Sequence, residues 1–121
     1  MGKRTRRKPV RRVAVVGSLA EARAVLAEAG SRPVLLVSPP NAAASLGAGY
    51  YQALVEAARG EFPDAAIEAV MDCGDKPGFA LSALRAGFAT VGLVGDPRAR
   101  ARVAAIARAM GARLLSRPPR R

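Results

Sequence analysis

The densest group of chemically active side chains in the sequence is Asp72-Cys73-Gly74-Asp75-Lys76, which brings together two carboxylates, a thiol and an amine. The segment precedes an expected helix, whose unbonded N-terminal amides attract anions. Lys76 and these amides would then hold a phosphate or carboxylate, while Asp72 or Asp75 would accept a proton or bind a metal ion. The alternative is structural, with Asp75 as the helix cap, the glycines in turns and Lys76 solvated.

Nucleophilic catalysis at Cys73, the single cysteine, would require a base to ionise the thiol, and the sequence contains no histidine. A buried, structural Cys73 is therefore the better interpretation. The lack of histidine also excludes Ser-His-Asp triads and most zinc sites. The run Val16-Gly17-Ser18-Leu19 lacks the glycines of a dinucleotide-binding loop, and no Gly-Lys-Ser or Gly-Lys-Thr phosphate loop occurs. We therefore expect no cofactor and no metal ion.

The elements that must position these residues follow from apolar β-branched runs that alternate with amphipathic stretches. The expected strands are 12–17, 33–37, 66–71, 90–94 and 112–115, and the expected helices are 19–29, 46–59 or 49–59, 79–86 and 97–110. With right-handed crossovers, this alternation predicts a single three-layer α/β domain with a flavodoxin-like sheet of four or five parallel strands. A half-barrel fragment of βα units is the alternative. The first strand lacks polar alternation, so we expect it to be buried on both faces.

Two helix starts have clear capping signals. Ser18 and Glu21 have the spacing of a capping box, and Asp96 before Pro97 is a typical cap followed by the preferred first helical residue. The last helix is expected to face the core with Val103, Ile106, Ala107 and Met110.

Ligands of open α/β sheets bind beyond the carboxyl ends of the strands. Four loops of this chain are expected at that edge, over residues 17–18, 38–41, 72–78 and 95–96. A small anionic ligand would be bound there by the candidate residues Ser18, Ser38, Asn41, Asp72, Asp75, Lys76 and Asp96.

The position of Asp72 at the end of the third expected strand is similar to that of the phosphoacceptor aspartate in receiver domains. The resemblance implies a flavodoxin-like fold and phosphorylation of Asp72. Receiver domains hold magnesium with an acidic pair after the first strand, where this chain has Gly17 and Ser18. They also carry a lysine after the fifth strand, where this chain has Ser116 and Arg117. The chain therefore departs from the receiver pattern at the groups that support phosphorylation.

The net charge of +11 is concentrated at the two ends of the 121-residue chain. Residues 1–12 form a basic N-terminal arm and residues 117–121 a basic C-terminal tail, and neither contains an acid. A nearly neutral domain, residues 13–116, separates them. Cationic ends on a neutral body are typical of proteins whose tails bind a polyanion such as RNA, DNA or an acidic membrane surface. The basic residues are Lys3, Arg4, Arg6, Arg7, Lys8, Arg11, Arg12, Arg117, Arg120 and Arg121.

Other interpretations of this charge remain open. The tails would equally serve as solubilising segments, and abundant alanine and arginine are typical of GC-rich bacterial coding sequences. Four more arginines on the last expected helix form either a solvated face or a basic patch that extends the tail contacts to phosphate. They are Arg98, Arg100, Arg102 and Arg108.

Two classes of function follow. The first is a non-catalytic α/β binding module whose basic tails contact nucleic acid or another polyanion. The alternative is a small enzyme or sensor that binds a phosphorylated or carboxylated metabolite at the strand-end loops. An edge strand and small-residue helices also favour a homodimer. One cysteine, and no apolar run near the roughly 20 residues of a membrane span, predict a soluble, cytoplasmic protein.

Overall fold

The computed structural model of the protein describes residues 12–40 and 42–116. Its strands are β1 (Arg12–Val15), β2 (Val34–Val37), β3 (Ile67–Asp72), β4 (Thr90–Gly92) and β5 (Arg113–Leu115). Its helices are α1 (Leu19–Ala29), α2 (Ala42–Ser45), α3 (Ala48–Glu61), α4 (Pro77–Arg85) and α5 (Pro97–Ala109). Strands and helices therefore alternate along the chain as the sequence predicts, with α2 as an additional short helix.

The five strands form one parallel sheet in the order β1-β2-β3-β4-β5, which confirms the predicted α/β class and its parallel sheet. Each strand pairs with the strand before it, so every crossover advances the chain in the same direction across the sheet. Right-handed crossovers that all advance in one direction place their helices on one face. In the flavodoxin-like order, 2-1-3-4-5, the chain reverses direction once and its helices cover both faces.

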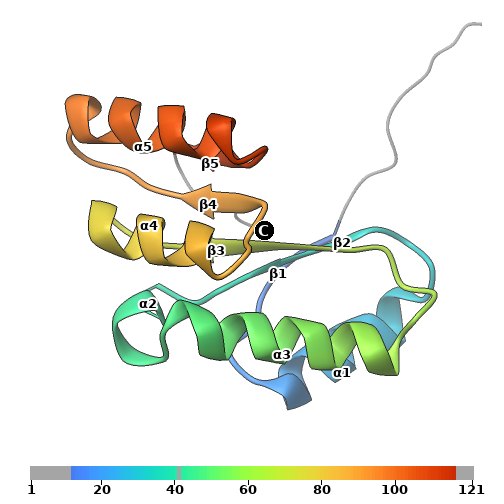
Figure 1. Cartoon of the computed structure of the whole chain (residues 1–121). Coiled ribbons are helices and arrows are strands. Elements are labelled where there is room, and N and C mark those ends of the chain that lie inside the picture. The colour runs from blue at the N-terminus through green and yellow to red at the C-terminus, as the bar shows by residue number, and fades with distance from the viewer. Residues whose placement is uncertain (1–11, 41, 117–121) are drawn as a thin grey trace, which may run out of the picture.

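The packing of the helices agrees with winding in one direction. α1 packs against α3, α3 against α4, and α4 against α5. Figure 1 shows α1 beside α3 and α4 beside α5. Buried residues of all five helices share one core cluster with Ala14, Leu36, Met71 and Val91 of the sheet. Within the predicted α/β class, the observed strand order therefore favours the half-barrel arrangement over flavodoxin-like winding.

The opposite face of the sheet carries a smaller apolar cluster, formed by Leu35, Val37 and Val70 with the partly buried Val13 and Leu115. Among the residues that the structure describes, no helix contributes to this cluster. β1 lies at the edge of the sheet and is less buried than predicted. The expectation that it is buried on both faces is wrong, because the described helices cover only one of its faces.

The core joins the helices to the sheet through small aliphatic side chains and one aromatic pair. Tyr51 of α3 is fully buried and stacks on Phe88, with the ring centroids 6.1 Å apart. The Tyr51 hydroxyl donates a hydrogen bond to the carbonyl oxygen of Val16 at 2.8 Å. This bond ties α3 to the end of the first strand.

The starts of α1 and α5 have the predicted N-caps. Ser18 Oγ accepts a hydrogen bond from the N–H of Glu21 at 3.1 Å, and the Glu21 carboxylate accepts one from the N–H of Gly17 at 2.6 Å. The Ser18 bond is the predicted one. The Glu21 bond differs from that of a standard capping box, because its donor is the residue before the N-cap Ser18. Asp96 caps α5 by accepting a hydrogen bond from the N–H of Ala99 at 3.0 Å.

Two predictions about helices need correction. α4 begins at Pro77 with Lys76 rather than Asp75 as its N-cap, and no side chain bonds to its first amides. Proline at the first helical position sets this start, two residues earlier than predicted. On α5, Ile106 and Met110 are 43% and 52% exposed instead of facing the core. The reason is that α5 lies at the end of the helical layer, where it packs against α4 and β5.

The described residues begin at the end of the predicted N-terminal arm. Arg12, which the sequence assigns to the arm, is the first residue of β1. The rest of the predicted arm, Asn41 and the predicted C-terminal tail lie outside the described residues. Within residues 12–40 and 42–116, none of the helices combines the length and the apolar character needed to cross a membrane.

Candidate functional site

The carboxyl edge of the sheet brings together the loops predicted to carry a site. The loops after β1 and β2 touch, since a methyl group added at Gly17 would lie only 3.0 Å from Cγ of Pro39. The loops after β3 and β4 are joined by a hydrogen bond from the N–H of Val94 to the carbonyl oxygen of Gly74 at 2.8 Å. Neighbouring loops are therefore in contact, as the strand order requires.

Four of the candidate side chains at this edge bond to the backbone of the same edge. Ser38 is 1% exposed, and its Oγ accepts a hydrogen bond from the N–H of Asp72 at 2.8 Å. Asp72 Oδ1 accepts one from the N–H of Gly74 at 3.0 Å. Ser18 and Asp96 cap α1 and α5. These side chains hold the loops in place, and Ser38 connects the ends of β2 and β3.

Asp75 and Lys76 are exposed candidates whose side chains bond to each other. Their side chains form an ion pair, with Nζ of Lys76 3.2 Å from Oδ1 of Asp75, and each is 65% exposed. Gly95 packs closely on this pair, since a Cβ at Gly95 would lie 3.1 Å from Cβ of Asp75. Lys76 stands at the positive end of the α4 dipole. The Asp75 carboxylate offsets that charge, so the pair presents little net charge to an anion.

Cys73 is buried and chemically quiet. It is 2% exposed, and its thiol donates to the carbonyl oxygen of Met71, with Sγ 3.7 Å from that oxygen. Burial, together with the nearby Asp72 carboxylate, raises the pKa of the thiol to about 12. A nucleophile needs the ionised form, so the structure supports the structural interpretation of Cys73. In the described ranges, no three His, Cys, Asp or Glu side chains gather where they could hold a metal ion.

The resemblance of the Asp72 position to receiver domains does not extend to the sheet. Receiver domains have the flavodoxin-like order 2-1-3-4-5, whereas this sheet is wound sequentially. One carboxylate oxygen of Asp72 is bonded to the backbone of the next turn. The fold therefore gives no support to a phosphoacceptor role for Asp72.

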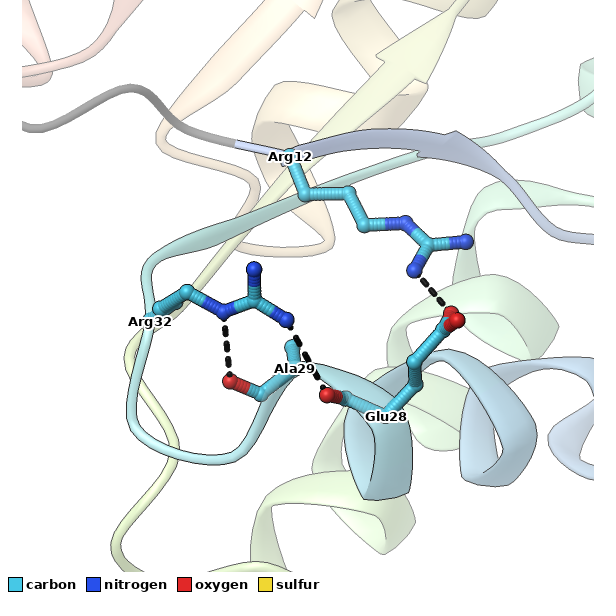
Figure 2. A network of polar contacts seen from close by, with 4 residues as sticks. All are labelled: Arg12, Glu28, Ala29 and Arg32. Atoms are coloured by element: carbon cyan, nitrogen blue, oxygen red, sulfur yellow. Dashed lines mark hydrogen bonds and ion pairs between the residues drawn. The ribbon is translucent and has the colours of Figure 1, made fainter.

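Arg12 is the one described residue of the ten basic residues assigned to the tails. Its guanidinium forms a hydrogen-bonded ion pair with Glu28 of α1, and this contact lowers the pKa of Glu28. Figure 2 shows the pair beside Arg32, which donates to the carbonyl oxygens of Ala29 and Glu28, each at 3.1 Å. Arg12 thus belongs to the folded body. The remaining nine lie outside the described residues: Lys3, Arg4, Arg6, Arg7, Lys8, Arg11, Arg117, Arg120 and Arg121.

A hollow of about 320 Å³ lies at the opposite edge of the sheet, where the sequence predicts no site. It is bounded by Gln52 and Arg59 of α3 and by the chain around Phe88. Arg59 is already paired with Glu56 at 2.7 Å and donates to the carbonyl oxygen of Ile67 at 3.3 Å. Because the hollow forms where segments far apart in the chain meet, no periodic pattern within one element could predict it.

A second hollow, of about 220 Å³, lies between α5 and β5. Arg100, Ala101 and Ala104 of α5 line one side, and Leu114 and Ser116 line the other.

The chain matches no protein-family model, and the search of curated proteins gives no significant match. The function must therefore be argued from the chemistry of this chain alone.

Proposed function

We propose that the protein is a non-catalytic α/β binding module whose basic tails contact the phosphate backbone of nucleic acid. The placement of charge carries the proposal. Residues 1–11 and 117–121 contain nine of the 20 lysines and arginines and no acid. All nine acids lie between residues 12 and 116, together with the other eleven basic residues. The tail charge has no counterion in its own segments, and a phosphate backbone supplies one.

The fold supports contacts at two separate places. The arm joins β1 and the tail follows β5, and these are the two edge strands of the sheet. Four spacings of about 4.8 Å place the edge strands about 19 Å apart. At full extension, residues 1–11 reach about 37 Å and residues 117–121 about 17 Å. Two charged segments that start so far apart suit an extended polyanion better than a small ligand.

The strand-end loops support a structural role more than a catalytic one. Ser38 and Asp72 are bonded to backbone amides, and Lys76 is paired with Asp75. In the alternative function, an enzyme or sensor for a phosphorylated or carboxylated metabolite, Lys76 would have to leave Asp75 to bind the anion. Binding of inorganic phosphate that is lost in Lys76→Ala would favour this alternative. The buried free thiol of Cys73 suits a reducing compartment, and the proposal places the protein in the cytoplasm.

The test compares the wild-type chain with a full-length variant whose nine basic tail residues are replaced by glutamine. Fluorescence anisotropy at low salt measures binding to a short DNA duplex and to a single-stranded RNA. We expect the variant to bind at least about a hundredfold more weakly, because its counterion release is lost. Arg23→Gln, which removes an arginine paired with Glu61 in the body, is the control and should bind like the wild type.

Two outcomes would contradict the proposal. One is equal affinity of the wild type and the tail variant for both nucleic acids. The other is tail-dependent binding to anionic phospholipid vesicles without binding to either nucleic acid, which would assign the tails to a membrane surface.

A further inference from the structure

The folded body, residues 12–116, has a net charge close to zero, but its charges are unevenly distributed. Residues 12–72 contain four basic and seven acidic side chains, whereas residues 73–116 contain seven basic and two acidic ones. Because the strand order is sequential, the first segment forms the β1–β3 side of the sheet and the second forms the β4–β5 side. The asymmetry in sequence is therefore an asymmetry in space, with the positive side at β5.

Ion pairing concentrates this excess on α5. Acids pair with five of the described basic residues, namely Arg12, Arg23, Arg59, Lys76 and Arg113. Six arginines in the described part of the chain form no ion pair with an acid, and four of them belong to α5: Arg98, Arg100, Arg102 and Arg108. The other two are Arg32 and Arg85. The acid next to α5, Asp96, is engaged in capping its first turn.

The outer face of α5 is open to an extended anion. Arg98 and Arg102 are exposed and lie one turn apart, which places their Cβ atoms about 5–6 Å from each other. The exposed Ala101 and Ala105 lie beside them on one side, and the exposed Ile106 follows Arg102 by one turn. The small alanine side chains leave room for a phosphate backbone to approach the helix closely.

A second side of α5, which carries Arg100, faces the end of β5. Ser116, which directly precedes the tail, lines the same hollow as Arg100 and Ala101 of α5. The Arg100 guanidinium donates to the carbonyl oxygen of Gly95 at 3.2 Å, which holds it at this corner of the molecule. Arg100 therefore adds positive charge near Ser116, on a side of α5 different from that of Arg98 and Arg102.

We propose that the outer face of α5, centred on Arg98 and Arg102, is a folded binding surface for nucleic-acid phosphates. The inference rests on the proposed function, because it takes the same ligand, and it adds a defined place on the body. α5 contains no aromatic residue on which a base could stack. Its contacts are with backbone phosphates, and the binding is independent of base sequence.

The test measures the slope of log affinity against log salt concentration for full-length chains on duplex DNA. Each phosphate contact contributes about 0.9 to the magnitude of this slope. Arg98→Gln combined with Arg102→Gln should lower the magnitude by about 1.8, both in the wild-type chain and in the variant with neutralised tails. Glutamine is a good helix former, so circular dichroism should show an unchanged fold. Arg85→Gln is the matched control, since it removes an exposed arginine without an acidic partner from α4, and should leave the slope unchanged.

The outcomes separate this inference from the proposed function. A slope that depends on the tails but not on Arg98 and Arg102 overturns the inference and leaves the proposed function intact. A slope that depends on these two arginines but not on the tails overturns the proposed function instead. If Arg85→Gln lowers the slope as much as Arg98→Gln alone, the effect reflects total charge, and the α5 surface is disproved.

Discussion

The polar side chains at the strand ends differ mainly in whether they are hydrogen-bonded to the backbone. The sequence shows that Ser38 and Asp72 are polar and close to strand ends, but it does not show that Ser38 bonds to the amide of a residue 34 positions away. That contact depends on the pairing of β2 with β3. Residue type and spacing could therefore predict where the candidates lie, while their availability for a ligand became visible only in the assembled sheet.

The rate at which the Cys73 thiol reacts tests whether it is buried and protonated in the native protein. The pKa of its thiol rises from 9.0 to about 12 on folding, so at pH 8 the native thiol should react about a thousandfold more slowly with a disulfide reagent than the unfolded thiol. The protonated thiol stabilises the fold fully below about pH 9, and this stabilisation is lost as the pH rises towards 12. Stopped-flow labelling with and without denaturant measures the ratio. Rapid labelling of the native chain would show that Cys73 is accessible and ionised.

Tyr51→Phe should lower the free energy of unfolding. The hydroxyl of Tyr51 is bonded to the carbonyl oxygen of Val16 in the core, and its removal leaves that oxygen without this donor. We expect a loss of about 1–3 kcal/mol, measured by urea denaturation. Tyr50→Phe is the neighbouring control, because Tyr50 is 55% exposed. Equal stability of the two variants would mean that the Tyr51 bond contributes nothing.

Helices and strands were predictable where local chemistry decides them. The start of α1 follows from the Ser18 cap, and the start of α5 from Asp96 and Pro97. The less successful predictions concern packing between elements. Ile106 and Met110 were wrongly predicted to face the core. Their exposure depends on the position of α5 at the end of the helical layer, which is a tertiary property.

Ser18→Ala should destabilise the protein through the first turn of α1. The substitution removes the acceptor for the Glu21 amide, and losses at such caps are about 0.5–2 kcal/mol. Ser31→Ala, in the exposed turn after α1, provides the control and should change the free energy of unfolding little. Thermal denaturation of both variants measures the difference, and a stable Ser18→Ala variant would show that this cap is not formed.

The molecule as a whole depends on the direction in which the sheet is wound. The alternation of strands and helices predicted the parallel sheet, whereas strand order is decided by which faces must be covered. The partial exposure of Val15 on β1, 38%, reflects that outcome. Sequential order also separates the acidic β1–β3 side from the basic β4–β5 side, and it sets the arm and the tail at opposite edges. The sequence alone shows two basic tails and a nearly neutral body. The fold shows that the body itself has one positive side, at β4 and β5.

The most direct test of this organisation is the salt dependence of nucleic-acid binding by the full-length chain, measured on duplex DNA with and without the nine basic tail residues. We expect a steep loss of affinity for the wild type as salt rises, with a slope of about 0.9 for each phosphate neutralised. In the tail variant, only the smaller slope due to α5 should remain. A wild-type affinity that does not change with salt, or that the tail substitutions leave unaltered, would contradict the central claim that the tails bind phosphate.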